Sequence, residues 1–338
     1  MHMKGSQSMV FDSPVYIISN ASIVGKKEGE GPLANDFDLI CDDAMFGEKS
    51  WEMAESTLQK EAVSLALGKA SLNASHIRYL FAGDLLSQLI ATSFGLMDYN
   101  IPLFGLYGAC STCGEALGLG AMCISGGFAS HVLSLTSSHF ASAEKQFRFP
   151  LQYGNQRPAC STYTVTGSGA FVLSDQPTMF PKARITAYTP GRIVDYGVKD
   201  SMNMGACMAP AACDVIASHL HDFERAPSDY DKIITGDLGT VGKALLLDLL
   251  SEQHFDIHEQ HMDCGIEIFD GKTQETSAGG SGCGCSAVVL SAMILKKLES
   301  GSWKRVLFVP TGALLSTVSF NEGKPVPGIA HAVVLESP

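Results

Sequence analysis

Three apolar segments in the first half of the chain recur, in the same order, in the second half. The matched pairs are Leu80-Phe-Ala-Gly-Asp-Leu85 with Ile233-Ile-Thr-Gly-Asp-Leu238, Val132-Leu-Ser-Leu-Thr136 with Val306-Leu-Phe-Val-Pro310, and Gly169-Ala-Phe-Val-Leu173 with His331-Ala-Val-Val-Leu335. One such match arises easily by chance, but three in the same order do not, and their spacing is too long for a solenoid repeat. The sequence therefore predicts two copies of one folding unit, residues 1–175 and 176–338.

Helices and strands are expected to alternate in these halves. Ser50 can cap a helix over 51–67, where apolar residues recur at helical spacing. The other expected elements are helices at 86–97 and 111–125 and strands at 77–82, 101–107, 131–136, 164–174 and 183–190, with an insertion at 140–162. Apolar strands alternating with helices indicate mixed sheets covered by helices. Two halves stacked through their helices predict an α/β protein with a five-layer αβαβα fold.

Composition excludes several classes of function. The 338-residue chain has 35 acidic and 23 basic residues and a formal charge of −12, so it lacks the basic face that nucleic-acid binding requires. The first residues have no apolar run typical of a signal peptide, and Gly126-Gly127 interrupts the longest uncharged stretch. The ten cysteines lie mostly in apolar stretches, as reduced thiols of a cytosol-like compartment do. We expect a soluble chain without disulfides.

A tight turn of small residues places Cys110 at the start of the helix 111–125. The positive end of a helix dipole stabilises a thiolate or a bound anion there. The pattern fits a nucleophile and a merely buried cysteine equally well. Cys113 completes a C-x-x-C, which leaves a redox pair or half of a zinc site open, although no second C-x-x-C follows at a suitable spacing.

Several histidines border predicted strands. His139 follows strand 131–136 and is expected near the Cys110 pocket, with an exposed loop position as the alternative. His331 precedes the last apolar strand, where a structural role and a catalytic role both remain open. His258, His261 and Cys264 have metal-ligand spacing in an acidic segment that is expected to be an exposed loop. Three ligands without a fourth leave the zinc site open.

The insertion and a Gly-rich segment offer further contacts for a ligand. Arg148 and Arg157, among Phe147, Phe149 and Tyr153, either clamp a planar carboxylate or are solvated cations. The segment 279–286 has the glycines of a phosphate-binding loop without its lysine, which favours close packing between the halves. Asp84 and Asp237 occupy repeat-related strand ends, where they either bind calcium or, as we expect, cap helices.

Several motifs extend over most of the chain. They include Lys49-Ser-Trp-Glu-Met-Ala-Glu55, Gly108-Ala-Cys-Ser-Thr112, Thr136-Ser-Ser-His-Phe140, Glu144-Lys-Gln-Phe-Arg-Phe-Pro150 and Gly279-Gly-Ser-Gly-Cys283. With the duplication and the cysteine turn, they resemble the thiolase and ketoacyl-synthase superfamily, and within it the dipicolinic-acid-binding members of endospore formers. The resemblance implies the five-layer duplicated fold and puts Cys110 at the position of the enzymes' nucleophile.

The chain departs from those enzymes at two positions. Initiating ketoacyl synthases pair the cysteine with a His where this chain has Thr235-Gly-Asp-Leu238, and with an Asn where it has Gly279-Gly-Ser281; thiolases place a His in that second turn. A condensing enzyme needs a base to form the thiolate and donors to hold the oxyanion. We therefore expect a binding protein with a vestigial Cys110. The alternatives are an acyltransferase that uses Cys110 and a purely structural docking subunit.

The ligand implied by the resemblance is dipicolinic acid, free or as its calcium chelate, bound for uptake into the developing spore. The expected ligand-binding residues are Cys110, Ser111, His139, Asp84, Arg148, His331, Gly280 and Ser281. No cofactor is expected, and no metal except calcium carried with the ligand. The resemblance also implies membrane-protein partners of the same spore system, a peripheral position on the inner forespore or spore membrane, and a homodimer formed near strand 131–136.

Overall fold

One extended sheet, built twice from the same strand order, organises the chain. The computed structural model describes residues 2–148 and 156–338. The strands are β1 (His2–Lys4), β2 (Ser8–Gly25), β3 (Leu39–Cys41), β4 (Tyr79–Gly83), β5 (Leu103–Gly105), β6 (His131–Ser138), β7 (Tyr163–Thr164), β8 (Gly167–Ser174), β9 (Ala183–Thr189), β10 (Lys232–Thr235), β11 (His261–Asp263), β12 (Gly280–Ser281), β13 (Arg305–Val309), β14 (Thr311–Ala313), β15 (Gly328–Ala330) and β16 (Ala332–Glu336). The helices are α1 (Lys26–Gly29), α2 (Trp51–Lys69), α3 (Ile90–Leu96), α4 (Thr112–Ser125), α5 (Phe140–Phe147), α6 (Met204–Phe223), α7 (Gly239–Glu252), α8 (Cys264–Glu267), α9 (Cys283–Val289), α10 (Leu295–Glu299) and α11 (Thr317–Asn321).

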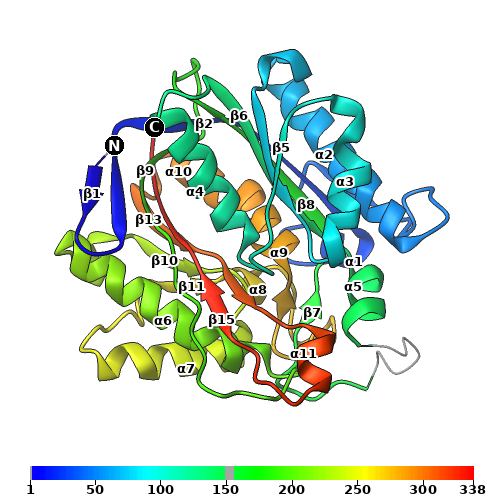
Figure 1. Cartoon of the computed structure of the whole chain (residues 1–338), viewed down its shortest axis with the longest axis vertical. Coiled ribbons are helices and arrows are strands. Elements are labelled where there is room, and N and C mark those ends of the chain that lie inside the picture. The colour runs from blue at the N-terminus through cyan, green and yellow to red at the C-terminus, as the bar shows by residue number, and fades with distance from the viewer. Residues whose placement is uncertain (1, 149–155) are drawn as a thin grey trace.

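The strand order confirms the duplication. The first half is ordered β5-β4-β6-β8-β2 and the second β11-β10-β13-β16-β9, so each first-half strand has a counterpart at the same place. In both halves, the fourth strand runs antiparallel to its two neighbours. The halves meet where β2 pairs antiparallel with β9, which joins both into a single hydrogen-bonded sheet. The expected boundary between 175 and 176 falls in the connection from β8 to β9 (Figure 1).

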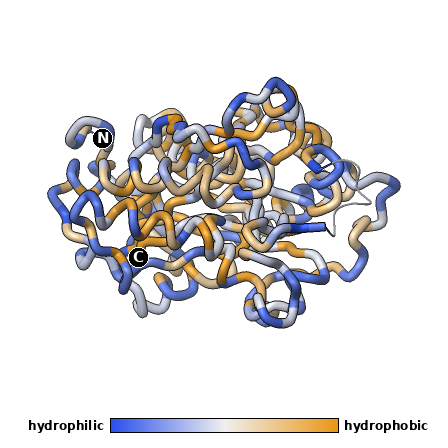
Figure 2. The backbone as a smooth tube through the Cα atoms, turned by 90° about the horizontal axis from the view of Figure 1, so that it is seen from below, coloured by the Kyte–Doolittle hydropathy of each residue, from blue (hydrophilic) through white to orange (hydrophobic). Residues whose placement is uncertain are grey.

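Alternating side chains along the strands sort the core into layers. Phe171 and Leu173 of β8 face the central core with α4, α9 and α10, whereas Val172 faces the outer core with α2. In the second half, Phe308 faces the central core and Leu307 faces the outer core with α6 and α7. The apolar segments accordingly run through the interior and the polar ones lie in outer turns (Figure 2). The arrangement is the five-layer α/β fold expected from the sequence.

Local signals explain several element ends. Ser50 caps α2, its hydroxyl accepting the Met53 amide at 3.3 Å, as the sequence predicted. Asp84 accepts the amides of Leu86 and Thr92 at 2.8 Å each, and so holds the turn into α3. The capping interpretation of Asp84 is therefore confirmed. Among the described helices, none is long and apolar enough to cross a membrane.

The expected dimer strand lies inside the sheet. β6, which contains 131–136, is hydrogen-bonded to β4 on one side and to β8 on the other. β6 itself therefore has no free edge for pairing with a second molecule, and the homodimer stays a prediction. In the first half, the outermost strand of the described sheet is β5, and its Leu103 and Phe104 are 42% and 50% exposed.

Candidate functional site

A left-handed turn presents Cys110 at the start of α4. Ala109 has φ of 49°, the conformation that reverses the chain between β5 and the helix. The Ser111 hydroxyl donates to the Gly108 carbonyl at 2.6 Å, and Thr112 Oγ1 both donates to the Ala109 carbonyl and accepts the Gly108 amide. These bonds fix the turn and leave the Cys110 thiol pointing away from it, 5% exposed. The predicted strand-to-helix turn is therefore present.

The second half contributes a carboxyl group to the thiol. Ser281 Oγ lies 4.0 Å from Cys110 Sγ and donates to Asp237 Oδ2 at 3.1 Å. The same oxygen accepts the Gly282 amide at 2.9 Å, and Asp237 Oδ1 accepts the Thr311 hydroxyl at 2.8 Å. Asp237 is thus locked between β10, the Gly-rich turn and β14. It joins the cysteine site instead of capping the helix that follows, which Asp263 does through the Leu238 and Gly239 amides.

The electrostatics of this pair oppose ionisation of the thiol. Burial, and next the charge of Asp237, raise the pKa of Cys110 well above its ordinary value. Burial also raises the pKa of Asp237 to about 6, although its hydrogen bonds to Gly282 and Thr311 act in the opposite direction. At neutral pH the site therefore holds a protonated thiol beside a largely ionised carboxylate. That state is the reverse of an activated cysteine nucleophile.

The thiol opens into a small cavity of about 30 Å³. Such a space holds a water molecule or two. Its lining residues come from both halves: Leu85, Tyr107, Ala109, Cys110, Ala143, Glu144, Phe147, Arg148, Thr164, Met204, Ser281, Ala313 and Leu315. An adjoining cavity of about 380 Å³ shares Tyr107, Phe147 and Leu315 with it. These three side chains therefore separate the thiol cavity from a more open vestibule.

The two predicted arginines converge on a carboxylate that belongs to the chain itself. Arg148 and Arg157 each pair with Glu144 Oε1, at 3.1 and 2.7 Å. Both also donate to the Thr162 carbonyl. Glu144 is 2% exposed, and its Oε2 faces no hydrogen-bond donor among the described residues. The two guanidinium groups converge on a carboxylate as predicted, but this carboxylate is that of Glu144 and not of a ligand. Phe149 and Tyr153 lie outside the described residues.

Of the predicted ligand-binding residues, Cys110, Arg148 and Ser281 line the thiol cavity. Ser111 is buried, and its hydroxyl donates to the Gly108 carbonyl. Asp84 is also buried, and its carboxylate accepts the Leu86 and Thr92 amides. Gly280 pairs with Tyr163 between β12 and β7, in the close packing of the halves that the glycines predicted. None of these three residues is among those that line the thiol cavity.

The two histidines do not reach the thiol cavity. His331 Nδ1 accepts the Gly191 amide, Tyr188 stacks beside the ring, and burial lowers the pKa of His331 to about 4. The His331 ring is therefore neutral near physiological pH, and its buried Nε2 has no hydrogen-bond partner among the described residues. His139 caps α5, accepts the Ala141 amide through Nδ1, and bonds the Ala44 carbonyl through Nε2. It lines a different cavity, so the expectation that it lies at the Cys110 pocket is wrong.

The histidine-cysteine segment at 258–264 is not an exposed loop throughout. His261 lies in β11 with Nε2 3.0 Å from the Thr235 hydroxyl, and Cys264 is buried in α8. His258 alone is exposed, next to Asp256. Within residues 2–148 and 156–338, no cluster of three or more His, Cys, Asp or Glu side chains could hold a metal ion. All ten cysteines are free thiols, Cys110 and Cys113 included.

Sequence reasoning missed the apolar wall of the cavity. Phe147 was singled out beside Arg148, but Tyr107, Met204 and Leu315 were not, and the four side chains converge from separate segments of the chain. Tyr107 could have been found, because it precedes the cysteine turn directly. Glu144 could also have been found, because it lies four residues before Arg148, the spacing of an ion pair on one helical face.

Solved structures with this fold are condensing enzymes and thiolases. The chain superposes on 3-oxoacyl-[acyl-carrier-protein] synthase III of Aquifex aeolicus with a TM-score of 0.57 at 14% identity, covering 95% of this chain and 99% of that one. For human mitochondrial 3-ketoacyl-CoA thiolase in complex with CoA, the TM-score is 0.58 at 13% identity, covering 98% and 99%. The chain thus has a thiolase-like fold, with an aspartate beside the cysteine.

Sequence comparison narrows this class to one family. The family model for stage V sporulation protein AD matches residues 5–336. The stage V sporulation protein AD of Bacillus subtilis is 44% identical over 336 residues, covering 99% of this chain and 98% of that protein. The chain belongs to the stage V sporulation protein AD family.

Proposed function

We propose that this sporulation-family protein binds dipicolinic acid, free or as the calcium chelate, for uptake into the developing spore, and that it catalyses no acyl transfer. The observation that carries the second part is the contact of Cys110 with Asp237 and Ser281. These residues stand where the resemblance to condensing enzymes predicts an imidazole and an amide. A carboxylate there keeps the thiol protonated and occupies the Gly282 amide as an acceptor.

The ligand is expected to enter through the wall of Tyr107, Phe147 and Leu315. Dipicolinate is larger than the thiol cavity, so these side chains must move for it to reach Cys110. One ligand carboxylate then takes the place of Glu144 on the Arg148 guanidinium, because a bidentate arginine–carboxylate pair compensates both buried charges. The positive end of α4 supports a second carboxylate near Ser281.

The proposed setting follows the family. Membrane proteins of the same spore system are the proposed partners, with the chain held peripherally on the inner forespore or spore membrane. The proposed homodimer forms along the β5 edge, where Leu103 and Phe104 are exposed, instead of along β6.

Calorimetry tests the binding. Dipicolinate is titrated with and without equimolar calcium into the protein and into Arg148→Gln; saturable heat that weakens in the variant supports the proposal. Absence of heat at millimolar ligand argues against it. Incubation with acyl-coenzyme A followed by intact mass measurement tests the rival enzyme. An acyl adduct on Cys110 would establish the acyltransferase and overturn the non-catalytic part.

A further inference from the structure

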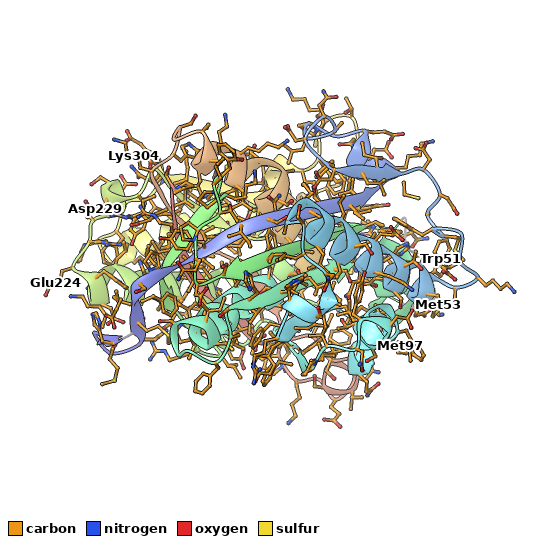
Figure 3. The ribbon with its side chains drawn as sticks, turned by 90° about the horizontal axis from the view of Figure 1, so that it is seen from above. Trp51, Met53, Met97, Glu224, Asp229 and Lys304 are labelled. Atoms are coloured by element: carbon orange, nitrogen blue, oxygen red, sulfur yellow. The ribbon has the colours of Figure 1, made fainter. Side chains whose placement is uncertain are left out.

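A second cavity lies at the start of α5, where His139, Phe140 and Ala141 line it. It measures about 710 Å³ and, among the described residues, shares no lining residue with the thiol cavity. Its walls are Gly25, Lys26, Lys27, Glu28, Glu30, Asp42, Ala44, Trp51, His139, Phe140, Ala141, Tyr163 and Thr166. Its volume is in the range of cavities that enclose small organic ligands. Trp51 marks its place, at the end of the molecule away from Glu224 and Asp229 (Figure 3).

Two aromatic surfaces face this cavity. Trp51 lies against the His139 ring, with ring centres 5.6 Å apart, and Phe140 stacks on Tyr163 at 4.2 Å with an angle of 13°. Both His139 nitrogens are engaged by backbone groups, so its ring is fixed and neutral. Burial lowers the pKa of His139 further. Phe140 and Tyr163 cover one face of each other, and the remaining aromatic surface of the walls is rigid and can pack against a planar ring.

A partly buried cation at the same cavity has no counter-ion. The Lys27 ammonium donates to the Gln274 carbonyl at 2.6 Å and lies 4.7 Å above the centre of the Tyr163 ring, but it pairs with no carboxylate among the described residues. Lys26 beside it makes no hydrogen bond or ion pair to any described residue. An anion bound between them would supply the missing charge.

The acidic groups of the cavity repel such an anion only weakly. Glu28 is 1% exposed, its Oε1 accepts the Thr166 amide, and burial raises its pKa to about 7. It is therefore partly neutral near physiological pH. Glu30 and Asp42 are exposed residues, so water and salt screen their charges.

We propose that this α1–α5 cavity is a second binding site, for a planar aromatic carboxylate held between the Trp51 and Phe140–Tyr163 faces with its anionic group on Lys27. The choice of dipicolinate as the probe rests on the function proposed above, since dipicolinate is a planar aromatic dicarboxylate. The two sites are linked through α5 and Arg157. Arg157 pairs with Glu144 of the thiol cavity and lies over the Phe140 and Tyr163 rings, at 5.2 and 5.3 Å.

Calorimetric stoichiometry with dipicolinate separates the two sites. The full chain is expected to bind two molecules. Lys27→Gln keeps a donor for the Gln274 carbonyl but loses the charge, and it weakens the second site by at least about tenfold, the value of one charge-assisted hydrogen bond. Cys110→Val fills the small cavity and removes the other site. Lys49→Gln, an exposed lysine close in sequence to Trp51, is the matched control and retains both.

Tryptophan fluorescence supplies a second readout, because the chain has two tryptophans, Trp51 and Trp303. In Trp303→Phe, emission excited at long wavelength comes from Trp51 alone. Dipicolinate stacked on Trp51 quenches this emission in a saturable way, and Lys27→Gln shifts the midpoint by the same factor as the calorimetry. Unchanged melting temperatures of the variants show that each still folds.

The outcomes distinguish the two proposals. Two sites, or one site that Lys27→Gln weakens and Cys110→Val does not, support the α1–α5 site. One site that only Cys110→Val removes, with Trp51 emission unaffected, overturns the α1–α5 site and leaves the proposed function intact. Absence of any dipicolinate binding overturns both.

Discussion

Replacing Asp237 by asparagine is expected to make the Cys110 thiol reactive. Cys110 Sγ lies 4.0 Å from Ser281 Oγ, which lies 3.1 Å from Asp237 Oδ2, so sulfur and carboxylate oxygen are no more than about 7 Å apart. At that distance two like charges repel by about 2 kcal/mol at an effective dielectric constant of about 20. This energy corresponds to a factor of about thirty in the ionisation of the thiol.

The assay is the alkylation rate of Cys110 by iodoacetamide, measured on its peptide by mass spectrometry from pH 5 to 9. At pH 8, Asp237→Asn is expected to react about thirtyfold faster than the unmodified chain. The difference should vanish towards pH 5, because the pKa of Asp237 is about 6 and its carboxyl is then protonated in both proteins. The less buried Cys41 serves as the internal reference for reagent and temperature.

A control variant separates charge from access. Thr311→Val removes a hydrogen bond to Asp237 and loosens the same network without removing its charge. It should leave the rate at pH 8 within a few-fold of the unmodified chain. Equal rates for Asp237→Asn and the unmodified chain, or equal gains in both variants, would refute the reasoning, because the thiol would then be governed by access alone.

Three further variants test other features. Burial raises the pKa of Glu55 to about 8, above its ordinary 4.5, so its contribution to folding stability is present at acid pH and is lost as pH rises towards 8. In Glu55→Gln, the free energy of urea unfolding should therefore fall less between pH 5 and 8. An unchanged slope would contradict this. Leu103→Lys at the β5 edge should give monomers in sedimentation velocity, whereas Phe180→Lys, on an exposed loop, should not. Phe147→Ala should speed dipicolinate association several-fold in stopped-flow mixing, since it opens the wall of the thiol cavity; an unchanged rate would mean that the ligand enters elsewhere.

The duplication was predictable because strands buried on both faces read as apolar runs, and three such runs repeat in one order. The Ser50 cap and the Cys110 turn were predictable because each depends on neighbours in sequence. The direction in which a side chain points after a strand end is not determined by its neighbours in the sequence. His139 follows β6 as expected, yet its ring bonds to the Ala44 carbonyl, ninety-five positions away, and lines a different cavity from that of the thiol.

The same limit explains the two arginines and the second cavity. Aromatic residues around Arg148 and Arg157 suggested an open clamp for the carboxylate of a ligand. The helix instead places Glu144 one turn before Arg148, where its carboxylate pairs with both guanidinium groups. The α1–α5 cavity joins residues from 25 to 166, and no single sequence motif spans the segments that line it. Only tertiary packing brings the Lys27 ammonium over the Tyr163 ring.

The aspartate beside Cys110 also determines the hydrogen bonds of the groups around it. It takes the Gly282 amide and the Ser281 and Thr311 hydroxyls as hydrogen-bond donors, so groups at the second-half turn that could face an oxyanion already have a partner. A histidine introduced at 237 alone would leave Ser281 unchanged. The Ser281 and Thr311 hydroxyls and the Gly282 amide would then lack the carboxylate that accepts their hydrogen bonds. Such a single change at 237 is unfavourable, since each unpaired buried donor costs about 1–3 kcal/mol. Asp237, Ser281 and Thr311 therefore hold each other in place, and a change at one of these positions alone disturbs the hydrogen bonds of the others.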